Sequence, residues 1–490
     1  MSARHDGGPN GDPAAARVLI ENRTFDEIAV GESASLQRTL SREDIALFAV
    51  MSGDVNPAHL DDEYAKSDVF HKIIAHGMWG GSLISTLLGT RLPGPGTIYL
   101  EQTLRFRRPV AVGDTITVSV TASTKDPERH RITFDCLAVN QQGETVIDGT
   151  AKVMAPTEKV SRPRVTLPEV SLRERGVVFR ELITRARPLA AIRMAVVHPV
   201  DRDALLGAIL AAQEGLIEPV LVGPEERIRA VAKTHGLQIA DLPLIATEHS
   251  HQAADVAVAL ARSGEVDALM KGSLQTDELM RAAVVQRTGL LTGRRMSHVY
   301  VIDVPTYPRP LLITDAALNV APGLDSKRDI VQNAIELAHA LGVPLPRVAV
   351  LSAVETVSAR LRSSLDAAAL AKMADRGQIR GGVVDGPLAF DNAVSPDAAR
   401  AKGIHSPVAG RADIVVVPDL ESGNILVKQL DYLADSQSAG IVLGGRVPIA
   451  LTSRADSPAA RVASCALAVL VAKPVAVAAA HPAALASGLP

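Results

Sequence analysis

The chain has 490 residues, about three times the ~150 residues of a typical domain, so its length favours more than one domain. It carries 51 Lys and Arg against 54 Asp and Glu, a formal net charge of −3, which gives no sign of nucleic-acid binding or of an acidic tail. With 47% hydrophobic and 21% charged residues, the composition is that of a packed globular protein and excludes wholesale disorder.

The aromatic side chains are distributed unevenly along the sequence. A uniform fold would spread them over the whole chain, so their concentration before residue 158 predicts two parts that are built differently. Eight of the thirteen lie in this first third: Phe25, Phe48, Tyr64, Phe70, Trp79, Tyr99, Phe106 and Phe134.

The N-terminus, the cysteines and the most apolar stretch indicate where the protein works. Residues 1–19 are rich in Gly, Pro and Ala and lack an apolar core, so we expect a flexible tail rather than a signal peptide. Cys136 and Cys465 match no zinc or redox spacing, which favours a reducing, cytoplasmic environment. Residues 462–480 are broken by a Lys-Pro pair, whereas a membrane span needs about 20 uninterrupted apolar residues. We therefore expect a soluble protein with no membrane partner, and a buried helix followed by a strand or turn in this stretch.

Residues 20–156 predict an α+β domain. Ser41 can cap a first helix, and a second, almost entirely apolar helix follows at about Met78–Leu88. An apolar helix followed by long alternating strands is typical of an antiparallel sheet that curls around the helix. The predicted strands are Ile98–Phe106, Thr115–Thr124, Arg131–Asn140 and Thr145–Val153.

The pattern changes after this domain. Residues 157–180 are charged, contain prolines and have weak periodicity, so they predict a linker or an ordered connector. In residues 181–482, short apolar runs alternate with helical segments, which predicts a parallel α/β sheet buried on both faces. Its size favours two subdomains with a cleft between them. The predicted strands are Met194–Val197, Pro219–Val222, Ala268–Met270, Val299–Asp303, Leu311–Thr314, Arg347–Ser352, Ile414–Val417, Ala439–Leu443 and Ile449–Leu451.

The densest polar cluster of the first domain is the run of residues 52–59, just after the first helix. A glycine and the Asn56-Pro57 pair predict a turn there, and such turns often only cap a helix. Asp54 and His59 can instead converge across the turn as an acid/base pair. The backbone N–H of Gly77, at the start of the apolar helix, is well placed to stabilise an oxyanion.

Four stretches of this domain carry a family resemblance: Phe48–His59, His76–Trp79, Leu92–Tyr99 and Phe106–Asp114. Across residues 20–155 they resemble the MaoC-like, R-specific enoyl-CoA hydratases. The resemblance implies a hot-dog fold, usually dimeric. It also implies that Asp54 and His59 hold and activate the water added across the double bond of a trans-2-enoyl-CoA, while the N–H of Gly77 polarises the thioester carbonyl. Asn56 is expected to help bind the substrate.

In residues 181–482, polar clusters follow four of the predicted strands, where open α/β sheets bind ligands. Each cluster alone is more often a cap or a turn, but four at the same edge of the sheet predict a cleft for phosphate or another anion. Arg281 and Arg454 would supply fixed positive charge, and helix N-termini would supply N–H donors. The clusters are Lys271 to Ser273 with Thr276, Asp277 and Arg281; Asp315 with Asn319; Asp419 to Asn424; and Thr452 to Arg454.

The same clusters carry a second resemblance, through Val266–Ser273, Thr314–Asn319, Val417–Asn424 and Leu451–Arg454. In order and spacing, over about residues 185–480, they resemble the phosphate acetyl/butyryltransferases. The resemblance implies reversible acyl transfer between coenzyme A and phosphate, on a fold like that of isocitrate and isopropylmalate dehydrogenases. It implies that Ser453 orients the thiol of coenzyme A and that Arg281 and Arg454 hold the acyl phosphate. The other residues expected to bind substrate are Lys271, Ser273, Asp315, Asn319, Glu421, Asn424 and Asp456.

The resemblance leaves open which base activates the thiol. The acetyltransferases use an aspartate a few residues after the Ser-Arg pair, but Ala460 stands near that position here. Asp456 is a candidate, although it can equally cap the helix that begins at Ser457-Pro458. Acetyl and butyryl substrates also both remain open.

The combined prediction is a bifunctional acyl-CoA enzyme with no metal and no organic cofactor. Its partners would be acyl-CoA, coenzyme A, phosphate and acyl phosphate, without nucleic acid, and we expect a homo-oligomer through either domain. One alternative is that only the transferase is active and that the first domain is a CoA-binding or oligomerising module. Another is an oxidoreductase on the dehydrogenase-like fold, against which the sequence has neither a clustered aspartate metal site nor a nicotinamide-binding glycine loop.

Overall fold

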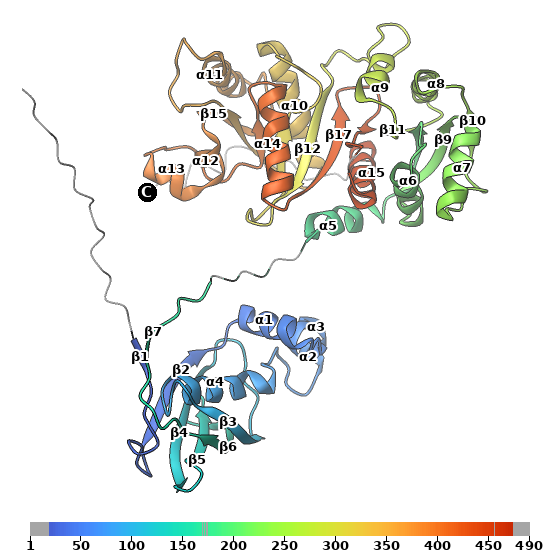
Figure 1. Ribbon diagram of the computed structural model, residues 1–490. Coiled ribbons are helices and arrows are strands. Elements are labelled where there is room, and N and C mark those ends of the chain that lie inside the picture. Colours follow the sequence, from blue (N-terminus) through green and yellow to red (C-terminus); the bar gives the residue numbers. More distant parts are fainter. Residues whose placement is uncertain (1–18, 169, 171, 173–174, 455, 474–490) are drawn as a thin grey trace, which may run out of the picture. The chain divides into compact units, whose positions relative to one another are not determined.

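The computed structural model describes residues 19–168, 170, 172, 175–454 and 456–473. The chain divides between residues 173 and 174 into two compact units, the N-terminal unit and the C-terminal unit (Figure 1). Of the predicted tail only Leu19 is described, and the strand or turn predicted after the Lys-Pro pair lies outside the described residues.

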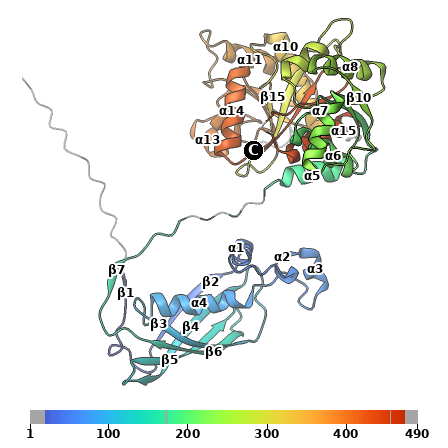
Figure 2. The same cartoon turned by 45° about the vertical axis from the view of Figure 1, so that its right-hand side comes forward.

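A five-stranded antiparallel sheet and one helix form the core of the N-terminal unit. The strands lie in the order β2-β4-β5-β6-β3, and helix α4, Gly77–Thr90, packs against one face of the sheet (Figure 2). Residues of β4 alternate between buried and partly exposed, as expected where one face of a sheet covers the core. This is the hot-dog fold, and the α+β prediction is confirmed. The strands are β2 Ser33–Thr39, β3 Ile98–Phe106, β4 Thr115–Asp126, β5 Arg131–Val139 and β6 Thr145–Met154.

Glycine allows α4 to lie close to the sheet. Trp79, Ile84 and Leu87 on the helix are buried in the core. A Cβ atom on Gly80 would lie 2.4 Å from Cδ1 of Ile147 on β6, so any larger residue must displace that side chain. The close approach therefore sets where the N-terminus of α4 stands over the sheet.

Helix α1 begins and ends as the sequence predicts. Ser41 Oγ accepts a hydrogen bond from the N–H of Asp44, and the carboxylate of Asp44 accepts one from the N–H of Ser41, which completes a capping box. Gly53 ends the helix in the left-handed region, φ 76°, and directs the chain into the loop that carries Asp54. The short elements of this unit are α1 Arg42–Ser52, α2 Pro57–Leu60, α3 Asp62–Ser67, β1 Leu19–Glu21 and β7 Ser161–Pro163.

The stretch predicted as a linker, residues 157–180, contains two pieces of regular structure. β7 pairs with β1, and helix α5, Val177–Ala186, begins before residue 180. Residues 164–168 between them are exposed. The apolar face of α5 becomes visible only from residue 177 onward, so the charged and proline-bearing residues before it concealed where the helix starts.

A single sheet of eleven strands runs through the C-terminal unit, in the order β10-β9-β8-β11-β18-β17-β12-β13-β16-β14-β15. The predicted alternation of strands and helices is confirmed, but the prediction of a purely parallel sheet is wrong. β12 is antiparallel to both neighbours, β13 and β17, and β17 is antiparallel to β18. Apolar runs indicate burial on both faces but not direction, and the connections 304–310 and 444–448 are too short for a crossover helix. The strands are β8 Ile192–Val197, β9 Ile217–Gly223, β10 Leu244–Ala246, β11 Ala268–Lys271, β12 Ser297–Asp303, β13 Leu311–Thr314, β14 Arg347–Leu351, β15 Val383–Leu388, β16 Ile414–Val416, β17 Gln437–Leu443 and β18 Ile449–Ala450.

The two halves of this sheet run in opposite directions. β10, β9, β8, β11 and β18 are parallel to one another, and so are β13, β16, β14 and β15, but the antiparallel pairings through β17 and β12 separate the two groups. Their carboxyl ends therefore point to opposite edges. The prediction that four polar clusters share one edge is wrong, because two follow β11 and β18 and two follow β13 and β16.

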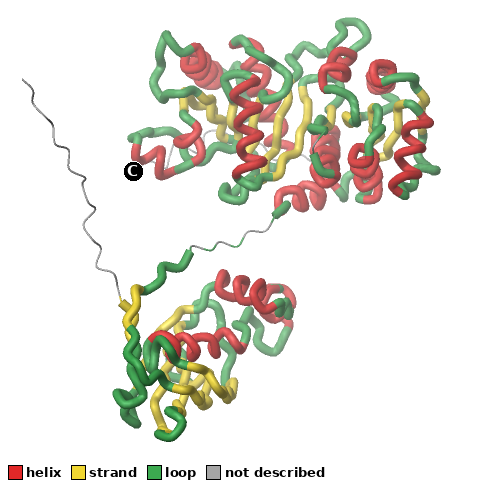
Figure 3. Tube along the Cα trace, in the orientation of Figure 1, coloured by secondary structure: helices red, strands yellow, loops and turns green. Residues whose placement is uncertain are grey.

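Helices cover both faces of the sheet (Figure 3). On one face, α5, α6, α7, α10, α11 and α15 share one continuous apolar core. The other face has two separate cores, one under α8 and α9 and one under α12, α13 and α14. α15 is buried over residues 460–470, as predicted, and no described helix is long and apolar enough to cross a membrane. The helices are α6 Arg202–Gln213, α7 Glu225–His235, α8 Ser250–Ser263, α9 Thr276–Ala283, α10 Leu324–Ala340, α11 Arg362–Asp375, α12 Phe390–Val394, α13 Pro396–Ala401, α14 Leu420–Leu433 and α15 Pro458–Ala472.

Candidate active sites

The first candidate site lies in the loop between α1 and α2. Asp54 follows the glycine that ends α1, and its Oδ1 accepts a hydrogen bond of 3.2 Å from the N–H of Asn56. Asn56 in turn caps α2, because its Oδ1 accepts a bond of 3.1 Å from the N–H of Ala58. These bonds hold the loop in place, and α2 then carries His59. The structure thus gives Asn56, which the sequence assigned to substrate binding, a capping role.

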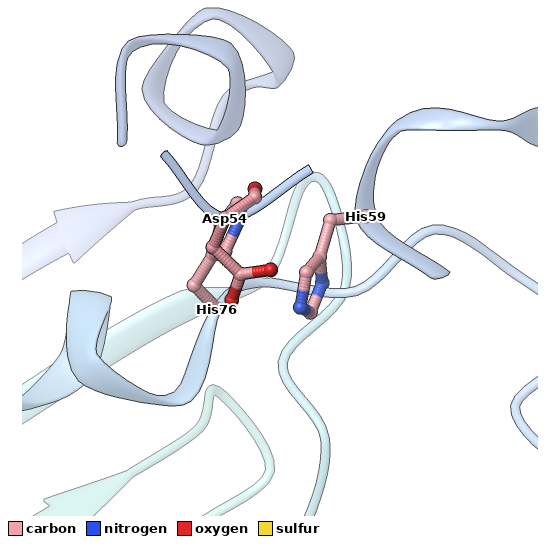
Figure 4. A group of neighbouring side chains, drawn as sticks. All are labelled: Asp54, His59 and His76. Atoms are coloured by element: carbon pink, nitrogen blue, oxygen red, sulfur yellow. Dashed lines mark hydrogen bonds between the residues drawn. The ribbon is translucent and has the colours of Figure 1, made fainter. Parts of the chain in front are cut away.

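Two imidazole rings lie beside Asp54 (Figure 4). Nδ1 of His59 is 2.9 Å from the carbonyl oxygen of Ile74, and Nε2 of His76 is 3.0 Å from the carbonyl oxygen of Asp54. The centroids of the two rings are 3.9 Å apart. Because a carbonyl oxygen only accepts, these two nitrogens must carry the protons. Each neutral ring is therefore held in one tautomer, with the lone pair on its other nitrogen.

His76 is a member of this site that the sequence analysis did not single out. It is 3% exposed, and its Nδ1 has no hydrogen-bond partner within the described part of the chain. It occupies the N-cap position of α4 without making a side-chain cap bond. The sequence signal for His76 was its position directly before Gly77 and an apolar helix, where a residue that caps the helix is usual.

Asp54, His59 and His76 place one carboxylate and two imidazoles within 4.8 Å of one another. Such a donor set can ligate a divalent metal such as Zn²⁺, and carbonyl oxygens often hold the second nitrogen of ligating histidines. The same arrangement serves proton transfer to and from a water molecule. The adjoining cavity favours the second use, because it joins these groups to an apolar chamber and a helix N-terminus.

This cavity measures about 310 Å³ and is lined by both imidazoles and by Gly77. A Cβ atom on Gly77 would lie 3.0 Å from Cε1 of Phe106, so glycine keeps this corner open. The N–H groups of Gly77 and Met78, the first two residues of α4, have no acceptor within the helix, and they carry partial positive charge. The cavity can therefore hold a carbonyl oxygen at the helix end and an apolar chain against Trp79 and Ile147.

The second candidate site is a cleft of about 1170 Å³ in the C-terminal unit. It is lined by α9, the segment before β12, the loop after β13, the start of α10 and the loop after β18. The cleft therefore combines loops from both halves of the sheet, although the halves run in opposite directions. Seven residues of the predicted clusters line it: Lys271, Thr276, Asp277, Arg281, Asn319, Ser453 and Arg454.

Ser453 lies on a loop that a buried arginine holds. Arg461 on α15 is 0% exposed, and its guanidinium donates to Oγ1 of Thr452 at 3.0 Å and to the carbonyl of Ser453 at 3.2 Å. It also donates to the carbonyl of Lys271 at 3.4 Å. Arg461 thus fixes the loop after β18 against the end of β11. The sequence analysis missed it, although a single charged residue in the apolar helix 458–472 is an unusual pattern.

Asp456 does not cap α15, because Ser457 does so by accepting a bond of 3.3 Å from the N–H of Ala460. Asp456 instead accepts a bond of 2.7 Å from the N–H of Ser453. Burial raises the pKa of the Asp456 carboxyl above its ordinary value. Asp456 is not among the residues that line the cleft. Its hydrogen bond therefore holds the Ser453 loop from outside the cleft.

Lys271, the last residue of β11, is 2% exposed and still lines the cleft. Its Nζ donates a hydrogen bond of 3.2 Å to the carbonyl of Thr452. Burial, together with the positive charges of Arg461 and Arg454, lowers the pKa of Lys271 to about 8. Lys271 is therefore partly neutral near physiological pH, unlike a solvent-exposed lysine.

Several arginines give the cleft its positive charge. The side chain of Arg281 is 72% exposed, and Arg454 is exposed as well. Arg295 donates through Nε to Oδ1 of Asn319 at 2.7 Å, so Asn319 positions a cleft arginine rather than standing alone. Arg294 and Arg295 line the cleft and were not named from the sequence. Guanidinium groups of this kind favour ligands that carry phosphate.

Besides Asp456, four residues predicted to bind substrate do not line the cleft. Oγ of Ser273 accepts a bond of 3.0 Å from a backbone N–H, and Asp315 is buried and accepts two backbone bonds of 3.0 Å. Asn424 donates to the carbonyl of Ala316 at 3.4 Å, and Glu421 is exposed on the first turn of α14. The first three shape the loops around strand ends.

An arginine-rich cleft that holds a serine loop against a buried lysine is suited to anionic substrates. Residues 242–469 match the family model described as phosphate acetyl/butaryl transferase. The chain is 58% identical over 291 residues to the phosphate acetyltransferase of Rickettsia typhi. This match covers 59% of this chain and 83% of that protein. The chain belongs to the phosphate acetyl/butyryltransferase family, and this membership sets the oxidoreductase alternative aside.

Two further relatives agree with this assignment. The phosphate butyryltransferase of Clostridium acetobutylicum is 41% identical over 294 residues, 60% of this chain and 98% of that protein. The structure of a branched-chain phosphotransacylase from Enterococcus faecalis is 28% identical with a TM-score of 0.51, and the match covers 57% of this chain and 99% of the other.

The N-terminal unit has matches of its own. Residues 27–138 match the family model described as MaoC like domain, so this unit is a MaoC-like domain. The unliganded R-hydratase of Pseudomonas aeruginosa is 44% identical, and the match covers 32% of this chain and 99% of that chain with a TM-score of 0.31.

Proposed function

We propose that the protein has two acyl-CoA activities. The C-terminal unit catalyses reversible acyl transfer between acyl-CoA and phosphate, and the N-terminal unit hydrates trans-2-enoyl-CoA to (R)-3-hydroxyacyl-CoA. Membership of the transferase family supports the first activity. The MaoC-like domain, with its Asp54–His59 pair beside a helix N-terminus, supports the second. The substrates are coenzyme A thioesters, coenzyme A, phosphate and acyl phosphate, and neither reaction as proposed uses a cofactor.

The transferase proposal rests on the convergence of Ser453, Arg454 and Arg281 on one cleft. A thiol with a pKa of about 8.5 is mostly protonated at neutral pH, so the cleft must promote the thiolate. Ser453 orients the thiol of coenzyme A, and the thiolate attacks the carbonyl carbon of the acyl phosphate. The two guanidinium groups stabilise the charge on the departing phosphate.

Acyl phosphate formation tests this proposal and resolves the acyl chain. The assay uses phosphate with acetyl-, propionyl- or butyryl-CoA, and we expect activity with at least one of them. Arg454→Ala should lower kcat/KM by about 10²-fold or more, because a preorganised charge at the leaving phosphate is lost. Arg376→Ala, exposed at the end of α11 and outside the cleft, is the matched control. Undiminished activity in Arg454→Ala contradicts the site.

The hydratase proposal rests on the apolar cavity that His59 and Gly77 line, and on the carboxylate of Asp54 within 4.8 Å of His59. The fixed tautomer of His59 leaves Nε2 free to take a proton from water, while the carboxylate of Asp54 holds the same water. The thioester oxygen lies at the N–H of Gly77, where the helix end stabilises the enolate that forms. Hydroxide adds to the β-carbon, and a proton then returns to the α-carbon.

Hydration of crotonyl-CoA, followed by the loss of enoyl absorbance, tests the second activity. We expect a measurable rate for the wild type and a kcat lower by about 10²- to 10⁴-fold for Asp54→Asn. Glu63→Gln, on exposed α3, is the control. Equal, near-zero rates for wild type and Asp54→Asn, in protein that retains acyl transfer, support the alternative of a CoA-binding or oligomerising module.

We further propose that the N-terminal unit pairs with a second copy through β3. Among the described residues, this strand forms the edge of the sheet and pairs with β6 alone. Its apolar side chains are unusually exposed: Ile98 is 54%, Leu100 41% and Phe106 54% exposed. An open edge with exposed apolar residues is a template for pairing with another strand.

A further inference from the structure

Lys271 reaches the same loop as Ser453. Its Nζ donates to the carbonyl of Thr452, the residue before Ser453, over 3.2 Å. Arg461 binds the carbonyls of both Lys271 and Ser453, so one buried cation ties the lysine and the serine together. The amine is buried from bulk solvent yet belongs to the wall of the cleft. Lys271 and Ser453 therefore line the same cleft, and the amine is bonded to the residue directly before the serine.

The surroundings of Lys271 favour a neutral amine. Arg461 from α15 and Arg454 from the loop after β18 place positive charge near Nζ, and burial acts in the same direction. Asp456 and Asp201 oppose them with weaker effects. At pH 7, a pKa of about 8 leaves about a tenth of the molecules with a neutral amine and hence a lone pair.

The three carboxylates that line the described part of the cleft each contact a neighbouring arginine. Asp277 lies 3.9 Å from Arg281, and Asp325 lies 3.7 Å from Arg328. Asp329 accepts from the backbone N–H of Arg295 at 2.9 Å. Ala460, near the position where a base was sought from the sequence, is buried on α15 and cannot accept a proton.

We propose that Lys271 is a catalytic residue that carries the proton between the thiol of coenzyme A and phosphate during acyl transfer. The inference rests on the proposed transferase activity. The neutral Nζ takes the proton from sulfur, the S–C bond to the acyl carbon forms, and the C–O bond breaks with its electron pair leaving on phosphate. The ammonium then gives its proton to that phosphate, which departs as HPO₄²⁻. In the reverse direction Nζ takes the proton of HPO₄²⁻ and returns it to the thiolate of coenzyme A.

Both directions start from a neutral amine, so kcat at saturating substrates should rise with pH through about 8 in the wild type. Lys271→Ala should lower kcat by about 10²- to 10⁴-fold, remove this rise, and leave the KM for coenzyme A within a few-fold. Ethylamine, which fits the space left by the side chain, should restore kcat in proportion to its concentration. A purely structural lysine gives no such rescue with a soluble base.

Two controls keep the test decisive. Lys372→Ala, an exposed lysine on α11, should keep wild-type kcat with or without ethylamine. Lys271→Arg keeps the charge but cannot release a proton, so it should be slow and should not respond to ethylamine. If thermal melting shows that the Lys271→Ala protein is not folded, Lys271→Arg becomes the decisive variant.

Three results would overturn the role of Lys271. They are wild-type kcat in Lys271→Arg, a folded Lys271→Ala protein that ethylamine does not restore, and a loss confined to the KM for phosphate. A wild-type protein that forms no acyl phosphate from any of the three acyl-CoA substrates instead overturns the proposed function itself, and this inference with it.

Discussion

The most unusual single residue of the C-terminal unit is Arg461, a fully buried arginine whose Nη atoms donate to a hydroxyl and carbonyl oxygens. Its Nε has no partner in the described part of the chain. A buried charge is unfavourable unless it is well bonded, so this arrangement calls for a function. Its position beside Lys271 supplies one, because its charge opposes protonation of the lysine.

Replacing Arg461 should therefore move a pKa as well as weaken the fold. In Arg461→Met the cation is absent, so the pKa of Lys271 should rise from about 8 toward its ordinary value of 10.5. Because the neutral amine is the active form, the rise of kcat for acyl transfer should move to higher pH by the same amount. Lost hydrogen bonds to a charged group should lower the free energy of unfolding by about 1.5–3 kcal/mol. A pH profile of kcat and denaturant melts measure the two effects.

Arg461→Lys separates charge from packing. It keeps a cation at the same place and should leave the pH profile close to that of the wild type, even if the loop is less firmly held. Equal profiles for the methionine, lysine and wild-type proteins would refute the electrostatic coupling between positions 461 and 271.

The distance along the chain decided which site residues were predictable. Asp54 and His59 face each other across one short turn, so their spacing revealed them. His76 instead contacts the carbonyl of Asp54 from 22 residues away, and Arg461 contacts the carbonyl of Lys271 from 190 residues away. Such contacts depend on tertiary packing, so a local pattern can mark the residue as unusual but does not show what it contacts.

At the scale of elements, the sequence predicted burial better than direction. The bounds of β3 agree with the predicted strand at both ends. The cap of α1 could be predicted because Ser41 and Asp44 are close in the sequence and interact locally. The sequence could not predict the directions of β12, β13 and β17, because a buried apolar run looks the same in a parallel and in an antiparallel strand. The four polar clusters were therefore assigned to one edge, while the cleft uses loops from both halves.

The edge strand β3 carries a prediction about assembly. Leu100→Lys places a charge on the exposed edge and should disrupt pairing with a second copy, since lysine on an edge strand opposes such association. In a protein with a protease recognition sequence in place of residues 164–168, we expect the mass of the cleaved N-terminal fragment, measured by light scattering after size exclusion, to fall by about half. Leu137→Lys is the matched control: Leu137 is 42% exposed, against 41% for Leu100, but lies on β5, which is paired on both sides. An unchanged mass in Leu100→Lys contradicts pairing through β3.

At the scale of the whole molecule, the two units fill their cores differently. The N-terminal core contains Phe25, Trp79 and Phe134 around one helix and one sheet. The large core of the C-terminal unit is built mainly of Ala, Val, Leu and Ile on a sheet covered from both faces. Core filling explains the uneven aromatic content only in part, because four of the eight aromatic side chains of this unit are exposed: Tyr64, Phe70, Tyr99 and Phe106.

Because each unit has its own core, each should keep its activity when the connection is cut. Residues 164–168 are exposed, with Val165 at 78% and Leu167 at 81%, so a protease recognition sequence can replace them without removing buried contacts. After cleavage we expect crotonyl-CoA hydration and acyl phosphate formation each to stay within about twofold of the uncleaved sample. Separation of the two fragments by size exclusion, with thermal melting of each, checks that both remain folded. Loss of either activity on cleavage, in fragments that remain folded, would mean that this unit needs the covalent connection.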